Sequence, residues 1–391
     1  MRLLKSLKSH SLIDCWFFLA SAIFAMPGIE IVGISASYFP CFFALVLIPR
    51  FVSQIPRVIL ALFSLGCMSF VIEIFIPTSS SFMSSRYRSV TNQINTKFAS
   101  SIQSENFVLW LKFSTALIGA TVLVLYAYSR KSEDIILSGF LTGSLVSVLI
   151  GFLTLKPGEG AFVQSIGLGR TNTTFGMICS FSISLLFVKS NSAKFNWVMV
   201  SLLMSGVLIS GSRGAALTSV SALFLNSIWR KGAPKFFAAS WSLTVAVLML
   251  IEHTVWLSSR IGVRAFTPSA SVSNSDLIRD QLRQQALIDW NYDPFSGVGF
   301  SVLTQGHSTY LQTLAAGGLL LFIGYLMTDL RTITSVIAAQ RLKNRSCLLA
   351  LAFCSIFNHF TQNQIDIPFL YLVVAITLIE SRAAVRQGEG G

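Results

Sequence analysis

The stretch FVLWLKFSTALIGATVLVLYAY, residues 107–128, decides the fold class. It carries one charged side chain, Lys112, in a run long enough to cross a bilayer, which takes about 20 mostly apolar residues. Comparable runs recur from residue 11 to residue 379, and the chain of 391 residues is 53% hydrophobic with a mean hydropathy of +0.68. The sequence therefore predicts an all-α, polytopic membrane protein, and it excludes a soluble domain, a secreted disulfide scaffold and a disordered tail.

The apolar runs predict about 12 spans in one membrane domain, residues 1–391. With the N-terminus inside, the larger share of the 29 Lys and Arg residues falls on the cytoplasmic side, so both termini are expected in the cytoplasm. A cleavable signal ending near Ala20 and Ala22 is the alternative for the first span. The even number of spans favours an uncleaved one. The expected spans are 11–26, 31–48, 58–76, 107–128, 135–155, 173–188, 197–211, 214–229, 236–257, 308–327, 347–360 and 367–379.

The longest connection, residues 258–306, is expected as an extracytoplasmic loop subdomain between the ninth and tenth spans. Ser275 and Asp276 are typical of a helix start, and Tyr292-Asp-Pro294 is typical of a helix end. Between them, apolar residues recur every four positions, which predicts an amphipathic helix over 275–290. These apolar residues are Ile278, Leu282, Ala286 and Trp290.

Arginines gather on the expected outer side, where the positive-inside rule does not favour them. Guanidinium groups bind phosphate oxygens bidentately, so a lipid diphosphate is a natural ligand for this group of cations. In the alternative, Asp276 and Asp280 neutralise the loop arginines at a solvated surface. Because the net charge of +13 is distributed between membrane faces, it does not indicate nucleic acid as a partner. The outer arginines are Arg170, Arg213, Arg260, Arg264, Arg279 and Arg283.

Arg213 lies in a break between two short apolar runs. An ionisable residue at membrane depth is a candidate functional residue, although an interfacial arginine whose side chain reaches the headgroups fits equally well. Arg170 precedes an expected outer helix start, where backbone N–H groups attract anions.

His307 follows the glycines Gly297 and Gly299 and precedes Ser308, at the start of an apolar helix on the outer side. Imidazole is the side chain best suited to accept a proton near neutral pH, so His307 is a candidate general base. The alternative is a histidine bonded to its own helix start. His253 and His359, near span ends, are interpreted as interfacial residues. No Walker loop, nucleophile elbow or metal-ligand spacing occurs, so no metal, nucleotide or other cofactor is expected, and the six cysteines are interpreted as inert thiols.

Three stretches in the C-terminal half resemble the O-antigen ligase and O-antigen polymerase superfamily of bacterial envelope glycosyltransferases. They are SGSRG (210–214), DPFSGVG (293–299) and HSTYLQTLAAGG (307–318). Their order, and the large outer loop before a His-Ser helix, carry the resemblance. The chain departs from the family pattern at Leu321, where a small residue is common, and this weakens a strict ligase assignment.

The resemblance implies an inverting, metal-independent transferase with a GT-C-like membrane fold in the bacterial inner membrane, acting in lipopolysaccharide biosynthesis. The donor would be a glycan on undecaprenyl diphosphate and the acceptor a lipid- or glycan-linked sugar hydroxyl on the periplasmic side. His307 and Arg213 would be catalytic. Arg170, Arg213 and Arg279 or Arg283 would bind the diphosphate, with Gly297, Gly299 and Ser308 as supporting residues.

Two other functional classes remain open at this point. A transporter or flippase of lipid-linked sugars also suits many spans and a basic cavity, but the sequence shows no similarity between its halves. A structural membrane subunit would leave the outer arginines unexplained. The sequence does not choose between ligase and polymerase.

Overall fold

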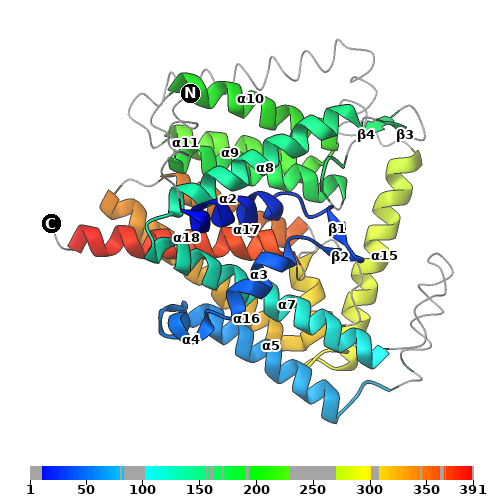
Figure 1. Ribbon diagram of the computed structural model, residues 1–391. Helices are drawn as coiled ribbons and strands as arrows, with labels where there is room; N and C mark the ends of the chain where they lie inside the picture. Colours follow the sequence, from blue (N-terminus) through cyan, green and yellow to red (C-terminus); the bar gives the residue numbers. More distant parts are fainter. Residues whose placement is uncertain are drawn as a thin grey trace.

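The computed structural model describes residues 11–79, 82, 102–154, 156–158, 162–164, 166–169, 171–189, 193–228, 270–300, 308–343, 346–361, 365 and 367–389. Within these residues the protein is a bundle of α-helices (Figure 1). The helices are α2 (Leu12–Phe24), α3 (Tyr38–Leu45), α4 (Ile48–Phe51), α5 (Arg57–Phe75), α7 (Ile102–Ser129), α8 (Glu133–Leu153), α9 (Asn172–Lys189), α10 (Ala193–Ser210), α11 (Arg213–Ile228), α15 (Ala270–Tyr292), α16 (Thr309–Lys343), α17 (Ser346–Thr361) and α18 (Pro368–Glu389). A 3-10 turn (Val52–Gln54) follows α4, and two small hairpins pair β1 (Glu30–Ile31) with β2 (Ile34–Ser35) and β3 (Lys156–Gly158) with β4 (Phe162–Gln164).

The lengths and composition of the helices agree with a multi-pass membrane protein. In the described part of the chain, α5, α7, α8, α16 and α18 each contain a segment long and apolar enough to cross a bilayer. Shorter apolar helices, including α2, α9, α10, α11 and α17, pack among them. The helical fold class is thus confirmed. The expected span 236–257 lies outside the described residues.

The expected span 31–48 is wrong as a single helix. Its first residues form the β1–β2 hairpin, in which Val32 and Gly33 both have positive φ, and α3 has only eight residues, about 12 Å of helix. The segment nevertheless advances along α7, because Cys41 packs against Gly119 and the ring of Phe51 lies 5.9 Å from that of Tyr126. The sequence correctly indicated an apolar segment here, but it did not indicate that the helix is interrupted.

Small residues set the close packing of α2 against α8. A Cβ atom at Gly139 would overlap Phe18 O, and one at Gly143 would overlap Ala22 O, so the two backbones approach each other at both glycines. This spacing of two small residues four apart is typical of helix pairs in membranes. Buried apolar side chains from these two helices and from most of the other helices, including α7, α9, α16, α17 and α18, form one core.

The loop helix α15 is longer than predicted. It begins at Ala270, so the prediction of Ser275 as its N-cap is wrong, but it ends at Tyr292 as the sequence indicates. Asp293 explains the end, because its Oδ1 accepts hydrogen bonds from the backbone N–H groups of Phe295 and Ser296, both at 3.1 Å. In Figure 1, α15 runs across the direction of the other helices, at the opposite end of the molecule from the end of α18.

Candidate functional site

Helix α16 is broken at Gly318. This residue has φ 58° and ψ −156°, which only glycine adopts without strain, and it divides the expected continuous span into a short first limb and a long second limb. The hydroxyl of Tyr310 donates a hydrogen bond to Oδ2 of Asp329. In an unbroken helix these residues, 19 positions apart, would be separated by about 28 Å. The two limbs are therefore folded back on each other.

The DPFSGVG segment, 293–299, fills the break. The N–H groups of Val298 and Gly299 donate to the carbonyls of Ala315 and Ala316 at 2.8 and 3.1 Å. On the other side of Gly318, the N–H groups of Leu319 and Leu320 donate to Pro294 O and Phe295 O at 2.9 and 3.3 Å. Backbone N–H and C=O groups that lose their helical hydrogen bonds at the break are thus hydrogen-bonded to residues 294–299. A non-helical segment inside a membrane bundle requires such partners.

Two glycines of this segment allow the close approach. Gly297 has φ 74° and Gly299 has φ 100°, and a Cβ atom at Gly297 would lie 2.6 Å from the backbone nitrogen of Gly317. Ser69 of α5 also donates a hydrogen bond to Ser296 O at 2.9 Å, so a third element holds the segment. Gly297 and Gly299, predicted as supporting residues, therefore lie directly against the helix that follows His307.

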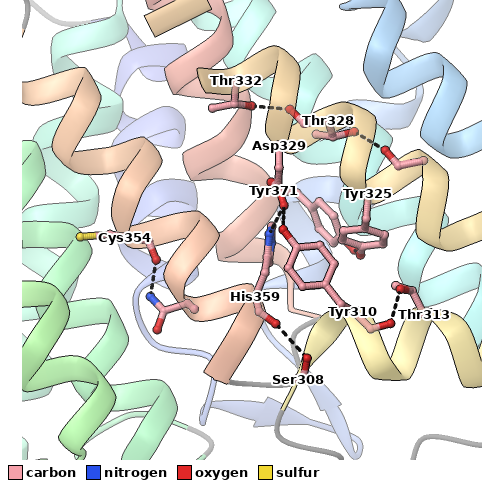
Figure 2. A network of polar contacts seen from close by, with 12 residues as sticks. Ser308, Tyr310, Thr313, Tyr325, Thr328, Asp329, Thr332, Cys354, His359 and Tyr371 are labelled. Carbon is pink, nitrogen blue, oxygen red and sulfur yellow. Dashed lines mark hydrogen bonds and ion pairs between the residues drawn. The ribbon is translucent and has the colours of Figure 1, made fainter. Parts of the chain in front are cut away.

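A buried polar network lies beside the folded limbs (Figure 2). Nδ1 of His359 on α17 is 2.9 Å from Oδ2 of Asp329, the same oxygen that accepts the Tyr310 hydroxyl. His359 and Asp329 are 1% and 3% exposed. The pair thus joins both limbs of α16 to the last turns of α17.

Aromatic residues enclose the imidazole. The rings of Tyr310 and Tyr325 meet that of His359 edge-on, with centroids 5.9 and 5.7 Å away. Tyr325 is hydrogen-bonded to Tyr371 of α18, whose hydroxyl donates to Ile365 O at 2.7 Å. Among the described residues, Nε2 of His359 has no hydrogen-bond partner. In the tautomer in which the Nδ1–H of His359 donates a hydrogen bond to Oδ2 of Asp329, Nε2 carries a lone pair that accepts no hydrogen bond from the described residues.

His359 lies in the last turn of α17, near a helix end as the sequence indicates, and its side chain is buried between helices. Asp329 was missed because the predicted span ended at residue 327, which placed this acid in a connection. The signal that could have found the pair is an acid and a histidine in two apolar helices, because ionisable side chains are rare in membrane-spanning segments and are usually functional there. Their contact across 30 positions of sequence depends on the break at Gly318.

Ser308 is the N-cap of α16. Its Oγ accepts from the N–H of Leu311 at 3.5 Å, its carbonyl accepts from Gln312 at 3.1 Å, and its side chain is buried. The Ser308 hydroxyl also lies 3.5 Å from the carbonyl oxygen of His359. The first turn of α16 therefore meets the last turns of α17. His307 itself lies outside the described residues.

The predicted arginines are described to different extents. Arg213 is the first residue of α11 and Arg279 lies within α15, but their side chains, and all of Arg170, lie outside the described part of the chain. Arg283 is exposed on α15 and pairs with Asp280 at 3.1 Å, which agrees with the surface alternative. The Arg283 side chain bonds to Asp280, and no contact joins it to Ser308 or His359 among the described residues.

The SGSRG stretch, 210–214, makes the expected turn between α10 and α11. Gly211 has φ 64°, and Ser212 caps α11 by accepting from the N–H of Ala215 at 3.3 Å. Helix α11 then packs on α9 and α17: Ser180 of α9 is hydrogen-bonded to Ser219 at 2.7 Å, and Sγ of Cys354 lies 3.6 Å from Thr218 O. Helix α11 thus meets α17 within the two turns that precede His359.

Among the described residues, no group of three or more His, Cys, Asp or Glu side chains is placed to hold a metal ion. No protein-family model matches this chain, and no curated protein matches it either. The resemblance to the O-antigen superfamily therefore depends on the three stretches themselves and on how they are arranged.

Proposed function

We propose that this protein is an inverting, metal-independent glycosyltransferase that moves a glycan from undecaprenyl diphosphate to an acceptor sugar hydroxyl, as an O-antigen ligase or polymerase does. The observation that carries the proposal is the docking of the DPFSGVG segment across the break in the helix that follows His307. Two backbone hydrogen bonds join the stretch 293–299 to the stretch 307–318, and two more join it to Leu319 and Leu320 directly after that stretch. This contact supports a common role for them at one site.

The chemistry requires a proton acceptor and cations. In the proposed step the acceptor hydroxyl loses its proton to the imidazole of His307 while its oxygen attacks the anomeric carbon of the donor sugar. The bond from that carbon to the diphosphate oxygen breaks, and its electron pair leaves with the lipid diphosphate. Arg213, with Arg170 and Arg279 or Arg283, offsets the charge that grows on the leaving group. No cofactor takes part.

The proposed site faces the periplasm of a bacterial inner membrane, with about 12 crossings and both termini in the cytoplasm. The placement of α15 at the opposite end from the end of α18 supports an outer loop and a cytoplasmic C-terminus. Membrane lipids surround the bundle, and the lipid tail of the donor lies among them.

A transfer assay with purified protein tests this function. The donor is a lipid-diphosphate oligosaccharide, the acceptors are candidate lipid- and glycan-linked sugars, and EDTA is present throughout. We expect product from the wild type. The rate of product formation should fall by about 100-fold or more in His307→Ala and in Arg213→Ala, since removing a general base or a charge-stabilising group typically has this effect. Arg331→Ala removes an exposed arginine of α16 and is the control.

One observation favours a second candidate, a transporter of lipid-linked sugars. Broken helices such as α16 are common at the substrate sites of transporters. In vesicles, movement of the donor to the other leaflet without its consumption would favour this candidate. Consumption of the donor with formation of a new glycosidic bond favours the transferase.

A further inference from the structure

The two opposite sides of α15 differ in their surroundings. Ala286 and Asp289 are buried and mark the side on which the helix packs against the bundle, where α15 contacts α16. Asp280, Gln284 and Asn291 lie on the opposite side, as the 100° rotation per residue of an α-helix requires, and all three are exposed. The side of α15 that faces away from the bundle is therefore polar.

An apolar flank lies between the buried side and the polar side. Ile288 and Tyr292 are four positions apart and so share one side of the helix, and Phe295 follows shortly after its end. These residues are 52%, 45% and 57% exposed. One to two turns earlier, the same flank carries the exposed polar residue Gln281. The flank therefore becomes apolar only towards the C-terminal end of α15.

The C-terminal end of α15 lies beside the C-terminal end of α5 (Figure 1). The Tyr292 hydroxyl donates a hydrogen bond to Oγ of Ser79 at 3.0 Å, and the Ser69 hydroxyl of α5 donates to Ser296 O at 2.9 Å. Helix α5 is long and apolar enough to cross a bilayer. It exposes large apolar side chains towards this end, namely Met68, Val71, Ile74 and Phe75. The apolar flank of α15 thus continues the apolar surface that α5 presents to lipid.

We propose that the C-terminal half of α15 rests in the membrane–water interface at this end of the bundle, with lipid acyl chains covering Ile288, Tyr292 and Phe295. An interfacial helix keeps its polar side in water and buries its apolar side at the boundary between headgroups and acyl chains. Tyrosine suits this level of a membrane, because its ring is apolar and its hydroxyl is polar. The inference does not depend on the transfer reaction proposed above.

Continuity with α5 favours lipid over the other occupants. In water, a row of large apolar side chains would stay uncovered directly beside a helix that is surrounded by lipid. A second copy of the chain would have to reach the flank at the same place where lipid already contacts α5. The flank also ends next to the 293–299 segment, which fills the break in α16. Lipid contact at the flank therefore supports the part of the chain that holds this segment in place.

Spin-label accessibility measures the position of the flank. Ile288→Cys and Phe295→Cys are made separately in the full chain without its native cysteines, labelled with a nitroxide, and placed in nanodiscs of phosphatidylethanolamine and phosphatidylglycerol. We expect more collisions with oxygen, which dissolves in lipid, than with a water-soluble nickel chelate, and a depth about 5–10 Å below the phosphate groups. Gln284→Cys, one turn before Ile288 on the polar side, is the matched control and should collide more with the nickel chelate.

Two results would overturn the inference. More frequent collisions with the nickel chelate than with oxygen, at position 288 or at position 295, would place the flank in water. Dipolar broadening between labels on two copies of the chain would assign the flank to a dimer interface instead. Both substituted side chains are exposed, and Phe295→Cys carries the test if Ile288→Cys does not fold. Since no step measures glycan transfer, failure of the proposed reaction leaves this result unchanged.

Discussion

Gly297 shows how one residue determines the geometry around the proposed site. Its positive φ turns the 293–299 segment, and the absence of a side chain lets its backbone lie against Gly317 and Gly318. A larger residue would meet the backbone of α16, which has no flexible end that could move aside. The residue thus controls both the path of the loop and the support of the break.

Gly297→Ala should therefore lower the stability of the protein, by about 1–3 kcal/mol from backbone strain with a further cost from the contact. Gly33→Ala is the matched control, because Gly33 also has a positive φ, but no neighbouring atom lies within 4 Å of the place that a Cβ atom would occupy. Thermal unfolding in detergent compares the two. If the melting temperature falls no further in Gly297→Ala than in Gly33→Ala, the close approach of Gly297 to α16 adds nothing to the cost of the substitution.

At the scale of elements, the helix pair α2 and α8 depends on Gly143. An added methyl group there would overlap Ala22 O, so the two helices must separate, and Gly143→Ala should destabilise the protein by about 1–3 kcal/mol. Gly151→Ala in the same helix is the control, because its nearest neighbours are side-chain atoms of Ile209 and Phe175 at 3.1 Å. Equal melting temperatures for the two variants would contradict a role of Gly143 in helix packing.

The positions of most helices could be predicted because apolar runs of sufficient length define them. The run at 107–128 became α7, and the end of α15 followed from Asp293 and Pro294. The break in α16 could not be predicted, because AAGG at 315–318 is compatible with a helix as well as a turn. Only the hydrogen bonds from residues 294–299 determine the choice, and these come from tertiary contacts.

The same break explains what could be predicted of the candidate site. Gly297, Gly299 and Ser308 could be identified from their place near His307 in sequence, and the structure places them at the start of α16 or against it. Asp329 and His359 could not, because their proximity depends on two limbs folding together. Local sequence can indicate residues that are close together along the chain. It cannot indicate residues that only the tertiary fold brings together.

At the scale of the whole molecule, two polar contacts join helix ends on the side opposite α15. The Ser132 hydroxyl donates to Asp14 at 2.8 Å, and the Tyr128 hydroxyl donates to Glu380 of α18 at 2.6 Å. Apolar helices connect this end to the end that carries α15. A bundle with distinct polar ends has a defined orientation in a membrane, which decides the side on which a substrate can reach the proposed site.

Cysteine labelling measures that orientation. In a background without the native cysteines, Gln284→Cys on the exposed face of α15 should react in intact cells with a maleimide that cannot cross the membrane. Ser129→Cys, at the exposed end of α7, should react only after permeabilisation, because the excess of basic residues predicts a cytoplasmic position for that end. The reverse pattern would place α15 and the start of α16 on the cytoplasmic side, where a periplasmic acceptor cannot reach them, and the proposed transfer to such an acceptor would be wrong.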